Sequence, residues 1–218
     1  MSDYHHRPDF SAAVSGVLTG VSFVAAITGA TRLAATPIPR PGAAAPAIRD
    51  YYSGSAAAVR FSVAGQAVSI ASLLVFTRAA ARLAQPGSGV KRGVLIGSGI
   101  ASAALLTASA ATHVSLSVPA GRDDEAVLRS ARRVFVLGGP VHGVTYGVFT
   151  GVLALLGRRA GLWGRAGLGI GLASAVAGVL SPSYFKWENA GWLIPIGRFS
   201  GYALGALAGV RMSRRASN

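Results

Sequence analysis

Six long uncharged runs restrict what this chain can fold into. A helix rises about 1.5 Å per residue, so about 20 residues cross the ~30 Å hydrocarbon core of a membrane. The chain is 51% hydrophobic and 13% charged, whereas soluble domains carry about 25% charged residues. We therefore predict an all-α fold, a polytopic membrane helix bundle with six transmembrane helices. The runs cover residues 10–31, 61–77, 93–121, 134–157, 166–185 and 189–210.

The predicted spans follow these runs with small adjustments. The second run is short unless it reaches back to Ser55, and that extension places Arg60 inside the span. Arg198 interrupts the sixth run. All spans belong to one transmembrane domain, residues 1–218. They are expected at about 10–31, 55–77, 93–117, 134–157, 166–185 and 190–210.

Charge in the connecting loops predicts the orientation of the bundle. If the N-terminus is cytoplasmic, the inner loops at 78–92 and 158–165 are short and contain basic but no acidic residues. The outer loops at 32–54 and 119–133 are longer and mix acids with bases. Because cytoplasmic loops carry an excess of Lys and Arg, we expect a multi-pass plasma-membrane protein with both termini in the cytoplasm.

Composition also excludes several partners and kinds of site. The net charge of +14 is spread between the spans and forms no stripe with interleaved aromatics, so no nucleic-acid partner is expected. The absence of cysteine excludes disulfides, iron–sulfur clusters and thiol nucleophiles. We expect no metal and no cofactor. Membrane lipid is the expected partner, and assembly into a homo-oligomer stays open.

Two rows of glycines at four-residue spacing indicate close helix packing. Small residues at this spacing let helix backbones approach each other in lipid. We therefore expect the rows to bring spans four and six together. The third span is rich in Ala, Ser, Thr and Gly, and we expect it at the centre of the bundle. The rows are Gly139, Gly143, Gly147 and Gly151, and Gly197, Gly201, Gly205 and Gly209.

Polar residues within the spans converge on the outer half of the bundle. Counted from the inner boundaries at 1.5 Å per residue, His142 lies about 22 Å up, Arg198 about 18 Å, Arg60 about 26 Å and Gln66 about 17 Å. His142 and Tyr146 are four residues apart and share a helix face. The candidate ligand-binding residues are Arg60, Gln66, His142, Tyr146 and Arg198. His113, Glu188, Trp187 and Trp192 are candidates for the rim, and Tyr51 and Tyr52 are expected at the membrane surface.

These polar residues allow structural and functional interpretations. A charge within a membrane is costly and normally faces protein or water. Arg60 can extend its head group to the surface, and Arg198 can pair with Glu188 only to hold the bundle together. The alternative is a bound anion, which a guanidinium grips well. A haem between His113 and His142 is not expected, because the two differ by about 8 Å in depth.

Three functions fit this pattern. The first is an outward-facing polar pocket that binds or transports a small anionic or amphipathic ligand. The second is a membrane enzyme that acts on a lipid or isoprenoid-like substrate, with His142 as general base. The third is an accessory or oligomeric membrane subunit whose glycine rows dock a partner. Nothing in the sequence identifies a reaction.

Four segments carry a resemblance to other membrane proteins. They are AIRDYYSGSAAAVR at 47–60, GGPVH at 138–142, RRAGLWGRAGLG at 158–169 and WLIPIGRFSGYALGALAGVRMSRR at 192–215. In these segments the chain resembles a group of small six-span integral membrane proteins, mostly actinobacterial and of unknown function. The resemblance implies the six-span fold and implies no reaction.

The loop charges generate a prediction about topology. A reporter that is active only in the cytoplasm should be active when fused after Asn218. The same reporter inserted in the 119–133 loop should be inactive, because that loop is expected outside. An active reporter in the loop and an inactive one at the C-terminus would reverse the predicted orientation.

Overall fold

The computed structural model describes residues 10–85, 89–118 and 121–216. In this part of the chain all regular structure is helical, and six helices are long and apolar enough to cross a membrane. The predicted all-helical, six-span architecture is therefore confirmed by length and composition. The spanning helices run over Phe10–Leu33, Ala56–Leu83, Gly89–Ser117, Asp124–Arg159, Arg165–Phe185 and Glu188–Arg215.

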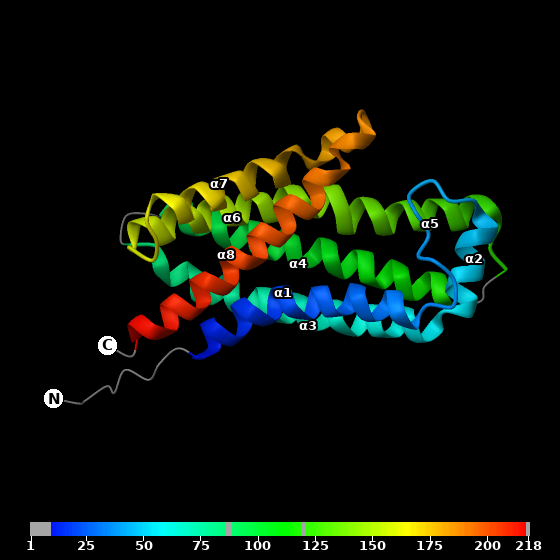
Figure 1. The fold of residues 1–218 in the computed structure, drawn as a ribbon, viewed down its shortest axis with the longest axis horizontal. Helices are drawn as coiled ribbons and strands as arrows, with labels where there is room; N and C mark the ends of the chain where they lie inside the picture. The colour runs from blue at the N-terminus through cyan, green and yellow to red at the C-terminus, as the bar shows by residue number, and fades with distance from the viewer. Residues whose placement is uncertain (1–9, 86–88, 119–120, 217–218) are drawn as a thin grey trace.

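The helices form an elongated bundle, and its two ends differ (Figure 1). α1 begins and α8 ends at one end, which we call the terminal end. α2 and α5 lie at the other, which we call the α2 end. The elements are α1 (Phe10–Leu33), α2 (Ala45–Gly54), α3 (Ala56–Ala80), η1 (Ala81–Leu83), α4 (Gly89–Ser117), α5 (Asp124–Val136), η2 (Leu137–Val141), α6 (His142–Arg159), α7 (Arg165–Leu180), η3 (Ser181–Phe185), η4 (Glu188–Trp192) and α8 (Leu193–Ala216).

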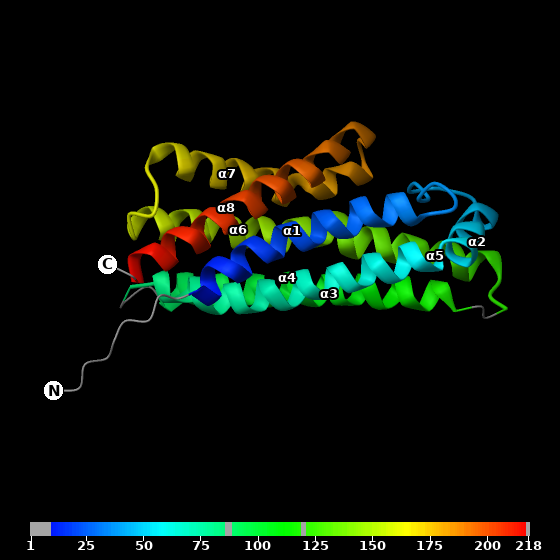
Figure 2. The same cartoon turned by 60° about the horizontal axis from the view of Figure 1, so that its bottom comes forward.

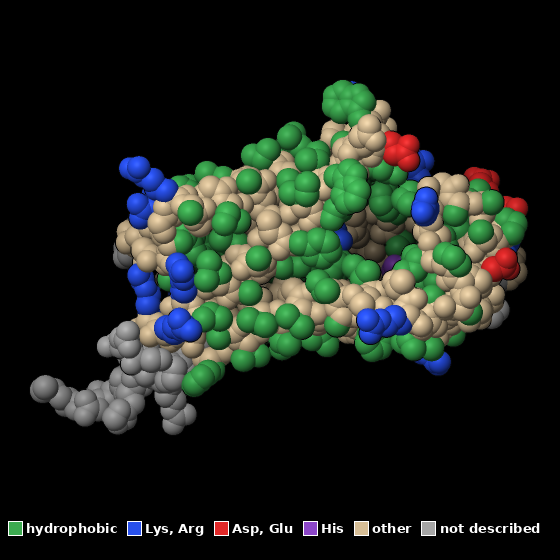
Figure 3. All heavy atoms as spheres, viewed as in Figure 1, with side chains coloured by type: hydrophobic (Ala, Val, Ile, Leu, Met, Phe, Trp, Pro, Cys, Tyr) green, Lys and Arg blue, Asp and Glu red, His purple; other side chains and the backbone are tan. Residues whose placement is uncertain are grey.

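The α7–α8 hairpin is shorter than the rest of the bundle. Its tip, formed by η3 and η4, stops before the α2 end in both views (Figures 1 and 2). Basic side chains without acidic ones gather at the terminal end, and acidic side chains appear only toward the α2 end (Figure 3). The first and last described residues thus lie at the end where Figure 3 shows basic and no acidic side chains among the described residues.

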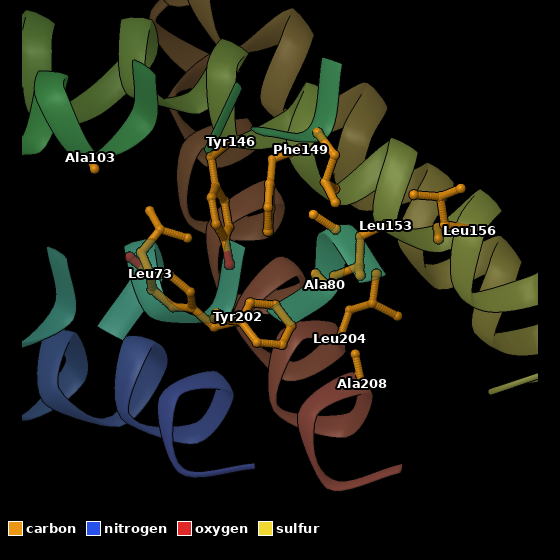
Figure 4. Close-up of a cluster of buried hydrophobic side chains, with 14 of the residues drawn as sticks. Leu73, Ala80, Ala103, Tyr146, Phe149, Leu153, Leu156, Tyr202, Leu204 and Ala208 are labelled. Carbon is orange, nitrogen blue, oxygen red and sulfur yellow. The ribbon is translucent and has the colours of Figure 1, made fainter. Parts of the chain in front are cut away.

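α6 is the central helix of the bundle, and the expectation that the third span takes this place is wrong. In the span that contains α6, 67% of the most apolar stretch is buried inside the protein. In α4, the third span, 39% of the corresponding stretch is buried. Tyr146, Phe149 and Leu153 of α6 enter a core with residues of α3 and α8 (Figure 4). Small residues permit close packing on every side, but large side chains fill a core and gain the most contacts there.

The glycine row of α6 packs against α7. A Cβ atom on Gly147 would lie 2.8 Å from the carbonyl oxygen of Ala175, and one on Gly143 would lie 2.4 Å from Ser181 Oγ. This row faces α7, so the approach of spans four and six comes from the α8 row, where Gly201 lies against α6.

The glycine row of α8 contacts four helices of the bundle, α7, α6, α3 and α1. A Cβ on Gly197 would lie 2.7 Å from the amide nitrogen of Gly178 in α7, and one on Gly201 would lie 2.7 Å from the ring of Tyr146 in α6. Near the terminal end, a Cβ on Gly209 would lie 2.3 Å from the carbonyl oxygen of Ala12 in α1. Helices of the same chain therefore pack against both glycine rows.

A π-helical turn joins α5 to α6. The outer segment at 119–133 contains most of α5, and η2 continues that helix into span four as one helix of 36 residues. Pro140 lies within the turn and has no amide hydrogen to donate to the preceding turn. A π-turn changes the backbone hydrogen-bond pattern locally. The Arg198 side chain of α8 donates a hydrogen bond to the carbonyl oxygen of Gly138 in this turn and lies 3.5 Å from that of Gly139.

The glycine contacts generate a prediction about stability. Gly147→Ala should destabilise the protein by about 1–3 kcal/mol, because the new Cβ has no room against α7. Gly97→Ala is the matched control on α4, where a Cβ would meet nothing within 4 Å. It should be neutral or stabilise by about 0.5–1 kcal/mol. Unfolding in detergent measures both, and equal shifts would contradict the packing of α6 on α7.

Candidate functional site

Arg198 near the start of α8 reaches the π-turn between α5 and α6. Its Nη2 donates to the carbonyl oxygen of Gly138 and lies 3.5 Å from that of Gly139. The same nitrogen lies 3.2 Å from Nδ1 of His142. The guanidinium carbon sits 4.9 Å from the centre of the Phe23 ring of α1, at cation–π distance. Arg198 therefore connects α8 to α1, α6 and η2.

His142 is fully buried and begins a stack of rings. Its imidazole lies parallel to the Tyr146 ring, with centroids 5.4 Å apart and planes 14° apart. Tyr146 contacts Phe149 in α6 and Tyr202 in α8, at centroid distances of 5.8 and 5.2 Å. The predicted grouping of His142, Tyr146 and Arg198 is thus present as a set of direct contacts.

The contact with Arg198 determines the tautomer of His142. A guanidinium has only N–H donors, so Nδ1 must accept the hydrogen bond. The proton of the neutral imidazole is then on Nε2. Among the described residues no group accepts a hydrogen bond from His142 Nε2 or from Arg198 Nε, and both atoms are buried.

Arg60 and Gln66 do not join this group. Arg60 is exposed on α3. Gln66 is buried, and its Nε2 donates to Ser62 Oγ at 3.2 Å on its own helix. Six residues of helix turn through about 600°, so these two side chains point about 120° apart, and they cannot both face Arg198. The depths counted from the sequence place Arg60 and Gln66 near the level of Arg198, but depth does not say which way a side chain points around its helix.

The α7–α8 tip supplies no acid to Arg198. Glu188 is exposed, and within the described residues no ion pair joins it to Arg198. The backbone carbonyl of Gly138 takes the place that the sequence interpretation gave to a carboxylate. Trp187 and Trp192 are 67% and 74% exposed, so these rings point away from the protein. Such exposed rings suit a membrane surface.

His113 is covered by α2, and sequence reasoning missed its partner. Its Nδ1 lies 2.8 Å from the hydroxyl oxygen of Tyr52. Tyr51 and Tyr52 are buried against other parts of the chain, and their depth at the membrane surface stays a prediction. Burial raises the pKa of the Tyr52 hydroxyl above its usual range, and the adjacent Tyr51 raises it further. The hydroxyl therefore stays protonated at neutral pH and able to donate.

A cavity of about 560 Å³ opens at the α2 end. Residues 38–43, α2, α5 and η3 surround it, and a hollow is visible in this region beyond the tip of the α7–α8 hairpin (Figure 3). Its charged lining residues are Arg40 and Arg132, and no described Asp or Glu lines it. The apolar wall includes Ile38, Pro41, Ile48, Tyr51, Phe135 and Tyr184.

The cavity lies near the edge of the hydrocarbon core. If Gly157 marks the inner boundary, about 20 residues of helix end near Gly138. The lining residues between Arg132 and Val136 then lie just beyond the hydrocarbon, at the level of lipid head groups. Sequence reasoning missed this cavity because its walls come from loop 38–43, α2, α5 and η3, which are far apart in the chain.

A second cavity of about 460 Å³ lies beside α2, but its arginines already have partners. Arg49 contacts Asp124 at 2.5 Å and donates to the carbonyl oxygen of Arg122 at 2.9 Å. Arg122 donates to the carbonyl oxygen of Ser115 at 2.6 Å. These contacts connect α2 to α4 and α5, which indicates a structural role for the two arginines.

Comparison of the chain with protein-family models, with curated proteins and with solved structures found no match. The interpretation of the site therefore depends on its own geometry. Two features stand out, the Arg198–His142 pair in the bundle and the basic, apolar-walled cavity at the α2 end.

The Tyr52–His113 contact generates a prediction about the α2 end. Tyr52→Phe removes one partly buried hydrogen bond and should lower the free energy of unfolding by about 0.5–1.5 kcal/mol. Tyr184→Phe is the matched control, because no described group forms a hydrogen bond with the Tyr184 hydroxyl. Unfolding midpoints of both variants in detergent test this, and equal midpoints would contradict it.

Proposed function

We propose that this six-span protein lies in the plasma membrane, with both termini in the cytoplasm, and binds or transports a small anionic amphipathic ligand at its outer, α2 end. The observation that carries the proposal is the cavity with an apolar wall, two arginines and no acidic lining residue. Membrane lipid surrounds the bundle, and nucleic acid has no role. The resemblance to small six-span proteins of actinobacteria supports the same architecture and adds no activity.

The chemistry of the cavity favours an amphipathic anion. The described residues form no hydrogen bond or ion pair with the exposed side chains of Arg40 and Arg132, so both guanidinium groups are available. Guanidinium groups bind carboxylate and phosphate through paired hydrogen bonds. A volume of about 560 Å³ falls within the usual range for small-ligand sites. The apolar wall suits the hydrocarbon part of such a ligand.

The two alternative functions have less support. As a general base, His142 would need access to a substrate, but it is fully buried and its Nδ1 accepts a hydrogen bond from Arg198. Docking of a partner subunit through the glycine rows would need exposed rows, but helices of the same chain cover them. The Arg198, His142 and Tyr146 part of the sequence-based ligand site stays a prediction.

Binding of a matched pair of lipids tests the proposal. The protein is placed in nanodiscs of neutral phosphatidylcholine and titrated with lysophosphatidate or with a monoacylglycerol of the same acyl chain. The anionic lipid should raise the unfolding midpoint saturably, and the neutral lipid should have a much smaller effect. The charge on Arg40 and Arg132 is the physical reason.

Two double variants separate the cavity from general surface charge. Arg40→Gln with Arg132→Gln should weaken lysophosphatidate binding at least tenfold, since a charge-assisted hydrogen bond contributes about 1.5–3 kcal/mol. Arg129→Gln with Arg133→Gln removes the same charge from α5 but leaves the cavity lining intact. Equal weakening in both double variants would contradict a site in the cavity.

A further inference from the structure

The cavity at the α2 end opens on the flank of the bundle. Figure 3 looks at right angles to the long axis of the bundle, and the hollow beyond the tip of the α7–α8 hairpin faces the viewer. α2 and residues 38–43 line the cavity toward the outer end, and η3 lines it on the side of the hairpin. The spans run along the long axis, so an opening on the flank faces the surrounding membrane.

The tip of the α7–α8 hairpin lies at the level of lipid head groups. Ser181 at the start of η3 donates to the carbonyl oxygen of Pro140 at 2.9 Å, so the tip begins level with the π-turn. That turn lies at the edge of the hydrocarbon core if Gly157 marks the inner boundary. A 3₁₀-helix rises about 2 Å per residue, so Phe185 lies at most about 8 Å beyond Ser181. One head-group layer is about 5–8 Å thick, and Phe185 therefore lies within it or at its outer limit.

The aromatic residues of the tip divide between the protein and its surroundings. The Tyr184 ring meets Phe135 of α5 edge-on, with centroids 5.3 Å apart. Phe185 lines the cavity, yet 52% of its surface is exposed. Trp187 and Trp192 are more exposed still. Exposed amphipathic rings are favoured where membrane meets water, so this tip suits contact with the head-group layer.

Charge and apolar surface occupy different depths of the cavity. Arg132 precedes Gly138 by six residues of helix and lies about 9 Å beyond the edge of the hydrocarbon core. Phe135 is three residues closer to that edge, and the tip residues Tyr184 and Phe185 lie on the same side of the cavity. A leaflet lipid has the same order, with its charged group outermost and its acyl chain inward.

We infer that the cavity takes its ligand sideways from the outer leaflet, and that this ligand is a lipid with a phosphate or carboxylate head group. The inference rests on the proposed function and deepens it by naming the source and the class of the ligand. The head group pairs with Arg40 and Arg132, and the acyl chain leaves the cavity past Phe185 into the leaflet. Trp187 and Trp192 hold the tip in the head-group layer beside this opening.

Tryptophan fluorescence measures the depth of the tip. The chain has three tryptophans, and Trp163 is buried in the α6–α7 connection, where its indole donates to the carbonyl oxygen of Ala154 at 3.0 Å. Trp163→Phe leaves the two indoles of the tip. In phosphatidylcholine nanodiscs, a nitroxide on the lipid head group should quench them several-fold more than a nitroxide at the end of the acyl chain. If this variant does not fold, the difference between the wild-type protein and a Trp187→Phe, Trp192→Phe double variant gives the same quantity.

Two outcomes of the depth measurement would overturn the inference. Stronger quenching by the acyl-chain nitroxide would place the tip inside the hydrocarbon core. Stronger quenching by aqueous iodide than by either labelled lipid would place it in water.

A ligand that carries a nitroxide tests the route. Lysophosphatidate labelled on its acyl chain is added to the Trp163→Phe protein in neutral phosphatidylcholine nanodiscs. Quenching of the tip indoles should saturate with the rise in unfolding midpoint, because the bound acyl chain passes the tip. A labelled monoacylglycerol should quench only in proportion to its concentration. Glycerol 3-phosphate, which carries the phosphate without an acyl chain, should not displace the labelled lipid. Full displacement would mean that the ligand comes from water, and would overturn the inference.

Two variants and the midpoint separate this inference from the proposed function. Arg40→Gln with Arg132→Gln should abolish the saturable quenching, and its persistence would overturn the inference. Val114→Trp, in a chain whose own tryptophans are replaced by Phe, places one indole on an exposed part of α4 outside both cavity linings. Saturable quenching there equal to that at the tip would also overturn it. A saturable midpoint rise without saturable quenching at the tip would uphold the proposed function alone, and no midpoint rise would overturn both.

Discussion

The hydrogen bond from Arg198 to the π-turn is the interaction on which the junction of α8 with α6 depends. A guanidinium in a membrane bundle requires acceptors, and the spans provide no carboxylate to it. The turn at Leu137–Val141 presents the Gly138 carbonyl to the guanidinium. Pro140 explains why a regular α-helix is interrupted at this point. One cation thereby joins α8 to the helix that runs through the centre of the bundle.

Close helix packing makes this hydrogen bond possible. α7 lies between the two glycine rows, and its Gly178 approaches Gly143, Gly147 and Gly197 through backbone atoms. Without side chains at these positions, α6, α7 and α8 pack at short range, so Arg198 reaches the turn near its own level. Van der Waals packing of small residues supplies the association that the hydrophobic effect cannot supply in lipid.

The α2 end has a different construction. A short helix and a loop cover the ends of α4 and α5, where Tyr52 contacts His113 and Arg49 contacts Asp124. The short α7–α8 hairpin stops below this cover, so the basic cavity lies between the two. The amphipathic ligand that we propose would place its polar part at this level and its hydrocarbon part on the apolar wall residues. The buried Arg198–His142 pair lies apart from that cavity lining.

Length and hydropathy in the sequence determined the helical class, the six spans and their approximate limits, because about 20 apolar residues cross a membrane only as a helix. Helical spacing also identified the shared face of His142 and Tyr146. Only the tertiary structure decided which helix neighbours which. It placed α7 against the α6 glycines, turned Arg60 away from Arg198, and gave Arg198 a backbone carbonyl in place of Glu188. Depth along a span can be counted from sequence, but rotation and neighbours depend on contacts between distant segments, which local patterns do not contain.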